Sequence, residues 1–493
     1  MVLNDISHGL ANVLDPTILA LMVFGVLLGI LMGSIPGMTA TMTIAVLLSF
    51  TFTLEPATGM MLLLGIFGGA VYAGSIPAIL IRTPGTPSAA ATIFDGYPLS
   101  QKGEAGRAIR MSTVASFIGG FISVLALMFL SPLIADAALR FRSPEFFALA
   151  LFGLTIIASV SGDSLTKGMI SGLLGMLIAT VGIDPLTGYQ RFTFDVPNLM
   201  GGIEFIAVMI GLFGIAEGLR KYAQGIDDDQ NQINQKITGV LPSLSDIKSI
   251  APISIVSGFI GSLVGAIPGA GGDIASFITY NEATRWLKDT TPSFGEGNIR
   301  GVAAAESGNN ASTGGALIPT FTLGIPGDSV SALLIGALMV HNVTPGPELY
   351  QDESGLLYTI FVGFLLIYVI ILIFGLLGAN YWARLINIPQ NYVWPVIFVL
   401  CVIGAIALSG TVFNAWVMLA AGGLGFVMRF RGYPLAPMVL GLILAPIAEA
   451  NLRRSLDISG GSLDIFYTSP IALTVILLSI ATVAVPAIRS VRD

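Results

Sequence analysis

The sequence predicts an all-α integral membrane protein that crosses the bilayer many times. Hydrophobic residues make up 54% of its 493 residues and charged residues 10%, and the mean hydropathy is +0.86. Soluble domains carry charge on about 25% of their residues, so this composition is typical of a membrane protein. At about 20 residues per spanning helix, the chain has room for roughly ten to thirteen spans or re-entrant segments and for no sizeable soluble domain.

A second observation is an apolar segment, 301–347, that contains many residues unfavourable in helices. We expect these residues to interrupt a simple helix at membrane depth. Non-helical backbone is tolerated there only where protein or water satisfies its hydrogen bonds, so the segment should line a site. The residues concerned are Asn309, Asn310, Thr313, Gly314, Gly315, Pro319, Gly324, Pro326 and Gly327.

A third observation is that this pattern occurs twice. The peptide SIPAILIRTPGTPSA at 75–89 is similar to LIPTFTLGIPGDSVSA at 317–332, and two prolines in each peptide are separated from their counterparts by the same 242 residues. Corresponding interrupted segments in the two halves of a transporter point to its binding site. The alternative is a pair of lipid-buried helices kinked by proline.

The first half begins with residues 1–17, which lack the basic start of a signal peptide and predict a short amphipathic helix on the membrane surface. A first span opens at Ile18, and glycines at four-residue intervals allow a neighbouring helix to approach closely. This span should break at Pro36 and Gly37, because proline lacks the amide proton. Further apolar runs predict spans at 38–54, 60–81, 112–138, 146–160, 168–181, 203–215, 360–376, 393–408, 416–430, 435–444 and 471–485.

The second half repeats this start. Gly261 and Gly265 continue the glycine stripe 232 residues later, and Pro268 and Gly269 repeat the break. An old duplication explains such a recurrence. We therefore divide the membrane-spanning part of the chain into two repeats and a linker, at 18–221, 222–248 and 249–493.

The charges of the loops give conflicting indications of how the two repeats are oriented relative to each other. The basic loop around Lys102 corresponds to an acidic loop around Glu348, which favours inverted repeats under the positive-inside rule. Two similar segments, IAEGLRK at 215–221 and IAEANLRR at 447–454, both end in basic residues and favour parallel repeats. We expect inverted repeats.

The two interrupted segments are the predicted substrate site. A helix that starts after a break presents unpaired N–H groups and the positive end of its dipole, which attract anions. Thr86 and Asp328 are also good helix N-caps, Arg82 could extend to the interface, and the asparagines could serve helix packing. The predicted substrate-binding residues are Arg82, Thr83, Gly85, Thr86, Ser88, Asn309, Asn310, Thr313, Gly327, Asp328 and Ser329.

A coupling cation or proton would need oxygen ligands at membrane depth. Asp273 occupies the position that Thr41 has in the first repeat, and Glu306 precedes the polar part of the second interrupted segment. Ionisable groups within the membrane are costly and are therefore functional candidates. We expect Asp273, Thr41 and Glu306 to take part in cation coupling, with a purely structural Asp273 and a loop position for Glu306 as alternatives.

Few residues are available for catalysis or stable metal binding. The single cysteine, Cys401, cannot form an intrachain disulfide, and His8 and His341 are too few for a zinc site. No G-x-x-x-x-G-K-[ST] sequence is present, so an ATP-driven step would need another chain. We expect no enzyme, no cofactor, no metal beyond transient Na⁺ and no nucleic-acid partner.

Longer motifs now carry a resemblance to a known family. GSIPAILIRTPGTPSAAATIFDGYPL, IPGAGGDIASFITYNEA and ESGNNASTGGALIPTFTLGIPGDSVSALLIGAL resemble the large membrane subunit of the tripartite tricarboxylate transporters, the TctA-type permeases. The resemblance covers nearly the whole chain. It implies a multi-pass permease in the bacterial inner membrane that imports tri- or dicarboxylates such as citrate, driven by a Na⁺ or H⁺ gradient.

The resemblance also implies partners. These are a small TctB-type membrane subunit of four spans and a periplasmic solute-binding protein of the TctC type. The repeated segments favour an elevator-like or rocking movement around a site at the midplane. The alternative function is a passive anion channel, which, unlike a carrier, cannot concentrate its substrate.

Overall fold

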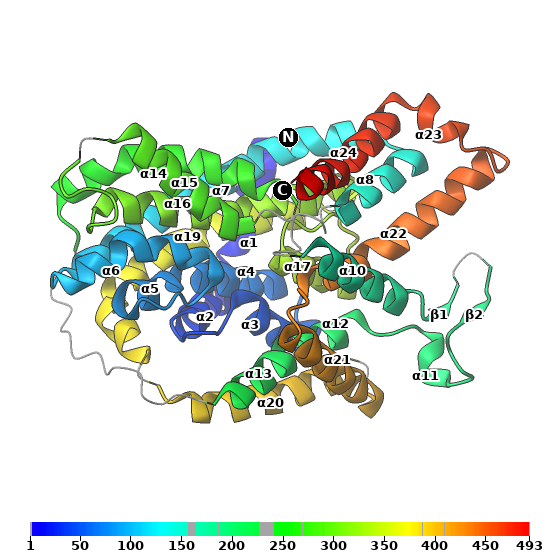
Figure 1. The fold of residues 1–493 in the computed structure, drawn as a ribbon, viewed down its shortest axis with the longest axis horizontal. Helices are drawn as coiled ribbons and strands as arrows, with labels where there is room; N and C mark the ends of the chain where they lie inside the picture. Colours follow the sequence, from blue (N-terminus) through cyan, green and yellow to red (C-terminus); the bar gives the residue numbers. More distant parts are fainter. Residues whose placement is uncertain are drawn as a thin grey trace. The chain divides into compact units, whose positions relative to one another are not determined.

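The structure, a computed structural model, describes residues 2–155, 164–184, 187–225, 241–268, 271–288, 290–386, 388–408 and 410–492. Residues 226–240 of the expected linker, with Asp227, and Gly269 of the second break lie outside the described residues. Within the described part, seven helices are long and apolar enough to cross a membrane, and six further apolar helices are shorter. The predicted all-α polytopic membrane protein is therefore confirmed (Figure 1).

The chain forms two compact units, and each unit combines segments from both halves of the sequence. Unit 1 consists of Met1–Ile134 and Gly225–Leu400, and unit 2 of Ala135–Gln224 and Cys401–Asp493. The helices of unit 1 are α1 (Val2–Val13), α2 (Pro16–Gly33), α3 (Ala40–Leu47), η1 (Leu48–Thr53), α4 (Pro56–Ala73), α5 (Ser75–Ile81), η2 (Pro87–Thr92), α6 (Ile93–Gln101), most of α7 (Ala105–Ala138), α14 (Leu244–Gly265), α15 (Gly271–Trp286), α16 (Ile299–Leu323), α17 (Ser329–Val340), α18 (Leu349–Asp352), α19 (Ser354–Leu385) and most of α20 (Gln390–Ala407).

Unit 2 is smaller and contains a short hairpin in which β1 pairs antiparallel with β2, Gly182 opposite Arg191. Two of its buried carboxylates are paired with arginine: Glu217 with both Arg220 and Arg429 at 2.5 Å, and Asp184 with Arg453 at 2.6 Å. No predicted site residue lies in this unit. Its elements are α8 (Ser143–Thr155), α10 (Leu165–Ala179), β1 (Gly182–Ile183), β2 (Gln190–Arg191), α11 (Pro197–Met200), α12 (Phe205–Met209), the π-helix η3 (Ile210–Ile215), α13 (Ala216–Gln224), α21 (Val412–Phe430), α22 (Ala436–Ile458), α23 (Asp464–Thr468) and α24 (Pro470–Arg492).

Some helices extend beyond the apolar runs that predicted them. The run at 203–215 continues through α12, η3 and α13 to Gln224, and the run at 435–444 continues in α22 to Ile458. Charged residues in these extensions form ion pairs, which lets the helices continue. The N-terminal helix α1 is present and packs on α19, where Asn12 donates to the Thr359 hydroxyl at 3.2 Å.

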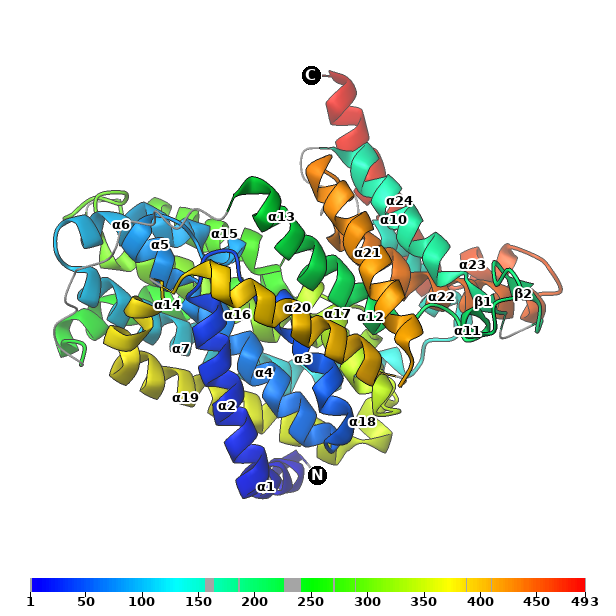
Figure 2. The ribbon, with the colours of Figure 1, turned by 90° about the horizontal axis from the view of Figure 1, so that it is seen from below.

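Glycine stripes bring two pairs of unit 1 helices into backbone contact. Helices α2 and α4 lie side by side (Figure 2). A Cβ added at Gly33 of α2 would come 2.8 Å from the Cα of Ala70 in α4. A Cβ added at Gly265 of α14 would come 2.7 Å from the Cα of Ser312 in α16. These contacts keep the 232- and 242-residue spacings of the sequence, so the duplication is present in the packing as well.

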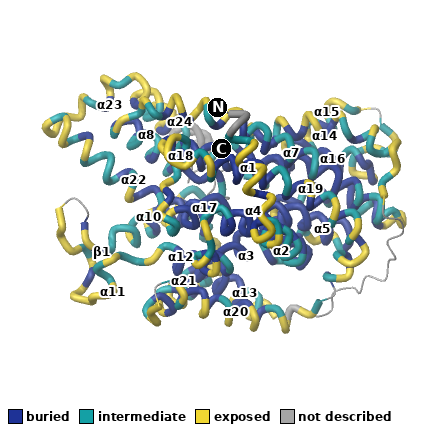
Figure 3. The backbone as a smooth tube through the Cα atoms, turned by 180° about the vertical axis from the view of Figure 1, so that it is seen from behind, coloured by how far each residue is buried: buried dark blue, intermediate teal, exposed yellow. Residues whose placement is uncertain are grey.

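Helix α16 runs without interruption from Ile299 to Leu323 and is buried along nearly its whole length (Figure 3). The expectation that Asn309 through Pro319 interrupt it was wrong. Hydroxyl groups inside the helix donate to its own carbonyls, for example Thr320 Oγ1 to Ala316 O at 2.6 Å, and the small residues give neighbouring helices close access. The break lies further along, between α16 and α17.

Helices α7 and α19 follow the first and the second interrupted segment and pack against each other. Gly375 of α19 lies against Thr113 near the start of α7, where an added Cβ would come 2.7 Å from Thr113 Cγ2. Tyr368 lies against Gly120, further along α7. Residue numbers therefore rise along α7 as they fall along α19, and the two helices are antiparallel.

Candidate functional site

The two interrupted segments have the same backbone geometry. Helix α5 ends at Ile81 and is capped by Arg82, whose φ is 58° and whose N–H donates to the carbonyl of Pro77. Helix α16 ends at Leu323 and is capped by Gly324, whose φ is 68° and whose N–H donates to the carbonyl of Pro319. Each left-handed residue reverses the chain, and a helix begins again five residues later, η2 at Pro87 and α17 at Ser329.

Glycines at the centres of both segments pack against a preceding helix. Gly85 donates its N–H to the carbonyl of Gly74 at 3.0 Å, and an added Cβ would come 2.9 Å from Gly74 Cα. An added Cβ at Gly327 would come 2.6 Å from the Cα of Ala316. Neither glycine has a positive φ, so close approach, rather than unusual backbone angles, requires glycine at both positions.

Two further breaks separate α2 from α3 and α14 from α15. Helix α2 ends at Gly33, and Pro36 and Gly37, the latter with a φ of 86°, lie between it and α3. Thr39 caps α3 through its hydroxyl, which accepts from Met42 N at 3.2 Å. In the second half Pro268 follows α14 in a turn, before α15 begins at Gly271.

Each post-break helix meets the interrupted segment of the other half. Thr41 of α3 hydrogen-bonds to Ser329 of α17 at 3.0 Å, Oγ1 to Oγ. At Gly272 of α15, an added Cβ would come 3.1 Å from Ser88 Cβ and 2.9 Å from the Asn309 Oδ1 atom. We call these residues, with Thr86 and Ser312, the helix-start cluster; its members are Thr41, Thr86, Ser88, Gly272, Asn309, Ser312 and Ser329.

The side-chain amide of Asn309 is the unsatisfied group of this cluster. Its Oδ1 and Nδ2 atoms are both buried, and neither forms a hydrogen bond of ordinary geometry with the described residues, although the amide is close enough to the Glu306 carboxyl group to act on it as a donor. Buried polar groups are normally paired, so an unpaired amide that faces other polar groups indicates a ligand site. Asn309 is therefore the strongest candidate for direct contact with substrate.

The neighbouring predicted residues are used in helix packing instead. Asn310 Nδ2 donates to the Ser116 hydroxyl of α7 at 2.9 Å, and Thr313 shares a 2.6 Å hydrogen bond with the Tyr368 hydroxyl of α19. These bonds support the packing alternative for Asn310 and Thr313. Tyr368 lies in an aromatic apolar run that gives no sequence signal for this role.

Glu306 lies inside α16 and is completely buried, so the loop alternative is wrong. Its carboxyl group accepts hydrogen bonds from Thr92 of η2 and, at 3.3 Å, from Ser116 of α7. No Lys or Arg of the described chain forms an ion pair with it, and its partners are neutral: the two hydroxyl groups and, at 3.5 Å, the Asn310 amide. A buried carboxyl group in such surroundings is suited to holding a proton or a small cation.

Asp273 and Asp328 lie close to each other beside the cluster. Asp328 caps α17, accepting from Ser331 N at 2.7 Å, and its Cβ lies 3.8 Å from the position of a Cβ at Gly271. The side chain of Asp273 is exposed, and it is close enough to Asp328 for the two carboxylates to interact electrostatically. Two neighbouring carboxylates repel each other when both are charged. A bound cation relieves this repulsion, so the pair is suited to cation binding.

Arg82 and Thr83 are not part of the cluster. Both are exposed, and the guanidinium of Arg82 lies 5.9 Å from the ring centre of Tyr97. A direct role for them in the buried site is not supported by this placement. His341 at the end of α17 is half-buried, and burial lowers the pKa of its imidazole.

Asp95 was not predicted, yet it joins the two halves. Its Oδ1 accepts from the backbone N–H groups of Gly295, Gly297 and Asn298 at 2.7–2.9 Å, and its Oδ2 from the Tyr280 hydroxyl at 2.9 Å. Burial raises the pKa of Asp95, and these hydrogen bonds oppose that rise. A charged residue in the apolar sequence TIFDGYPL was the available signal.

A helical membrane protein in which two matching interrupted segments each contact a helix that starts after a break in the other half has features typical of transporters. The sequence comparison then identifies the family: residues 19–440 match the Tripartite tricarboxylate transporter TctA family, and the chain belongs to it.

Two relatives come from Agrobacterium vitis. One, described as "Uncharacterized 52.8 kDa protein in TAR-I ttuC' 3'region", is 37% identical over 495 residues, covering 100% of this chain and 98% of the relative. The other, "Uncharacterized protein in TAR-II ttuC' 3'region", is 35% identical over 236 residues, covering 47% of this chain and 97% of the relative. No solved structure matches the chain.

Proposed function

We propose that this protein is the large permease subunit of a binding-protein-dependent secondary transporter that imports di- or tricarboxylates such as citrate. The observation that carries the proposal is the helix-start cluster, where α3 meets α17 at Thr41 and Ser329 and where α15 meets η2 beside the unpaired Asn309 amide. Convergent helix starts and neutral polar groups can replace the water shell of a carboxylate. Membership of the TctA family supports a role in transport.

The same geometry supports cation coupling. An anionic substrate at the cluster would lie near Asp273 and Asp328, whose charges would repel it. Na⁺ or H⁺ bound at these carboxylates, or at Glu306, removes that repulsion, so substrate and cation stabilise each other's binding. Thr41 and Ser329 supply neutral oxygen atoms within the same cluster.

Membership of the family supports a proposal for the partners and the location. We propose a small TctB-type membrane subunit and a periplasmic TctC-type solute-binding protein as partners, with the assembly in the bacterial inner membrane. The absence of a phosphate-binding loop from the sequence agrees with an ion gradient as the energy source. Unit 1 contains both interrupted segments, and we propose that it carries the substrate in an elevator-like or rocking movement.

Reconstitution tests this proposal against a passive anion channel. Proteoliposomes containing the three proposed components should accumulate labelled citrate or another di- or tricarboxylate above the external concentration when a Na⁺ or H⁺ gradient is imposed. Collapse of the gradient with an ionophore should remove the accumulation. Equilibration without accumulation under every gradient would identify a channel instead, because a channel cannot move its substrate uphill.

A further inference from the structure

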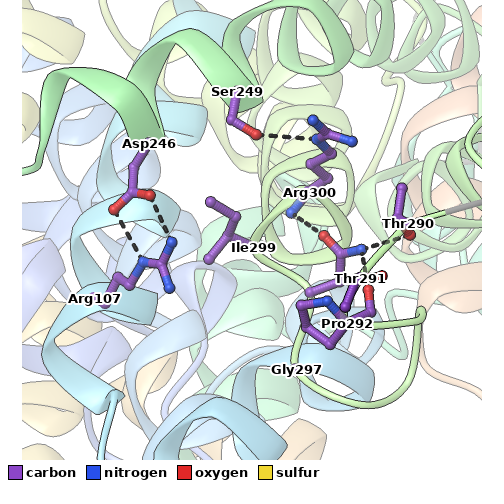
Figure 4. A pocket seen from close by; sticks show the side chains of 10 residues that line it. Arg107, Asp246, Ser249, Thr290, Thr291, Pro292, Gly297, Ile299 and Arg300 are labelled. Carbon is purple, nitrogen blue, oxygen red and sulfur yellow. Dashed lines mark hydrogen bonds and ion pairs between the residues drawn. The ribbon is translucent and has the colours of Figure 1, made fainter.

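A polar cavity lies in unit 1 at the start of α16. Its volume is about 330 Å³, and residues of α7, of α14 and of the loop before α16 line it (Figure 4). Pockets that bind small molecules measure roughly 300–1,000 Å³, so this cavity is large enough for a small solute. None of its lining residues was predicted to be functional.

The two arginines of the cavity differ in their partners. The Arg107 guanidinium is paired, through two hydrogen bonds of 2.6 and 2.9 Å to Asp246 and one of 2.7 Å to Glu104. Arg300, in contrast, donates from Nε to the Ser249 hydroxyl at 3.0 Å and forms no ion pair within the described chain. Its two terminal nitrogen atoms are therefore available to an anion, and guanidinium groups bind carboxylate and phosphate oxygens through such paired donors.

The wall opposite Asp246 is held rigidly. Asn298 donates from Nδ2 to Thr290 Oγ1 at 2.9 Å and to the Pro292 carbonyl at 2.7 Å, and its Oδ1 accepts from the Arg300 N–H at 2.9 Å. Thr290 accepts this bond, so its own hydroxyl proton can still be donated into the cavity. The binding groups are thus fixed before a ligand arrives, which lowers the entropy lost on binding.

We propose that this cavity binds the oxyanion group of a small soluble anion on Arg300. Arg300 and Asn309 lie on the same helix, about 14 Å apart along its axis at 1.5 Å per residue. In this proposal the cavity is a second anion site, at the start of α16, on the path of the substrate to the helix-start cluster. This role on the path rests on the proposed function, whereas binding of the anion does not.

Calorimetric titration of the purified full-length protein tests the site, with citrate and inorganic phosphate as separate probes. Arg300→Gln should weaken binding of at least one probe about tenfold or more, because it removes a charged donor from a partly enclosed site. Ser249→Glu places a carboxylate beside Arg300 and should also weaken binding. Arg285→Gln is the matched control, because Arg285 is an exposed arginine of α15 that pairs with Glu282 outside the cavity.

The two probes separate the two sources of the oxyanion. Loss of citrate binding alone identifies an organic carboxylate, and loss of phosphate binding alone identifies phosphate. Repeating the citrate titration in an Asn309→Ala background separates this cavity from the helix-start cluster, so a failure of the transport proposal leaves the result intact. Binding of both probes by Arg300→Gln or by Ser249→Glu as tightly as by the natural sequence, or no binding to the natural sequence, would overturn the proposal.

Discussion

Asn309 and Asn310 are adjacent on α16, yet the structure gives them opposite roles. The Asn310 amide joins α16 to α7 through Ser116, whereas both polar atoms of the Asn309 amide lack a hydrogen bond within the described chain. A buried unpaired amide destabilises the folded protein by about 1–3 kcal/mol. A bound substrate or ion that forms hydrogen bonds or ligand contacts with the amide removes this destabilisation. The pair therefore offers a built-in comparison between a ligand contact and a packing contact.

We expect Asn309→Ala to raise the concentration of carboxylate for half-maximal uptake about tenfold, with no loss of thermal stability, because no internal hydrogen bond is removed. Asn310→Ala should instead lower stability by about 1–3 kcal/mol. Uptake kinetics and thermal unfolding in detergent measure both effects. Equal effects of the two substitutions on uptake would argue against a substrate contact at Asn309.

We expect Asp273→Asn to weaken the coupling cation more than the substrate, because the substitution removes one of two neighbouring carboxylates and leaves the helix starts in place. The measurement is initial uptake as a function of Na⁺ concentration and of pH, at fixed carboxylate. Glu306→Gln should be measured in parallel, since both carboxyl groups are candidates. A cation dependence equal to that of the natural sequence in Asp273→Asn would make Asp273 structural.

The sequence predicted several residues of the cluster but not their partners. Thr41, Ser88 and Ser329 stood out because they follow breaks that proline and glycine make visible. The hydrogen bond between Thr313 and Tyr368 joins residues 55 positions apart, on helices whose packing no local pattern specifies. Asp95 accepts a hydrogen bond from a loop 200 residues later in the sequence, and it was missed for the same reason.

At the scale of elements, the interrupted segments depend on close backbone packing. Gly85 and Gly327 contact the residues Gly74 and Ala316, which are themselves equivalent in the two halves. Both breaks are thus built in the same way, and the sequence repeat predicted this. It did not predict the intact α16, because proline and glycine in a membrane helix are tolerated when neighbouring helices pack around them.

We expect Gly85→Val and Gly327→Val to abolish uptake, because a side chain cannot fit where an added Cβ already lies within 3 Å of the preceding helix. The segment must then move away from the helix-start cluster. Uptake should be measured together with the yield of monodisperse protein, since overpacking also costs about 1–3 kcal/mol of stability. Normal transport by either variant would exclude that segment from the site.

At the scale of the whole molecule, each compact unit contains residues from both halves of the sequence. The expected repeats, 18–221 and 249–493, stay a prediction about the duplication of the sequence, whereas the units describe how the chain packs. Composition predicted the fold class, and spacing predicted the duplication. That each unit combines segments of both halves could not be predicted from the sequence. This arrangement depends on contacts between helices far apart in the chain, such as α10 and α22.

We expect uptake to depend on a binding protein that contacts the exposed acidic segment around Glu348 and Asp352. Charge reversal at both residues should lower the apparent affinity for the loaded binding protein, and the effect should weaken at higher ionic strength. Initial uptake rate against binding-protein concentration is the measurement, with charge reversal at exposed Glu296 as the control. Saturable, full-rate uptake of free carboxylate without any binding protein would contradict this dependence.

We further expect the loop at Lys102 and the loop at Gln351 to face opposite sides of the membrane. Tyr350 lies beside Ser131, which is about 36 Å along α7 from Arg107 at 1.5 Å per residue, more than the thickness of the hydrocarbon core. In a Cys401→Ser background, Lys102→Cys and Gln351→Cys should react with an impermeant maleimide from opposite sides. Labelling of both from one side would rule out inverted repeats.

The antiparallel packing of α7 and α19 has a thermodynamic consequence. These helices occupy equivalent places in the two halves, and the inverted repeats that we expect would give the protein nearly the same construction when viewed from either aqueous phase. The two end states of the proposed transport cycle would then interconvert by exchanging the conformations of the halves, with similar free energies. A transporter of this kind is intrinsically reversible. Under the proposed function, the direction of net flux comes from the ion gradient and from a binding protein present on one side.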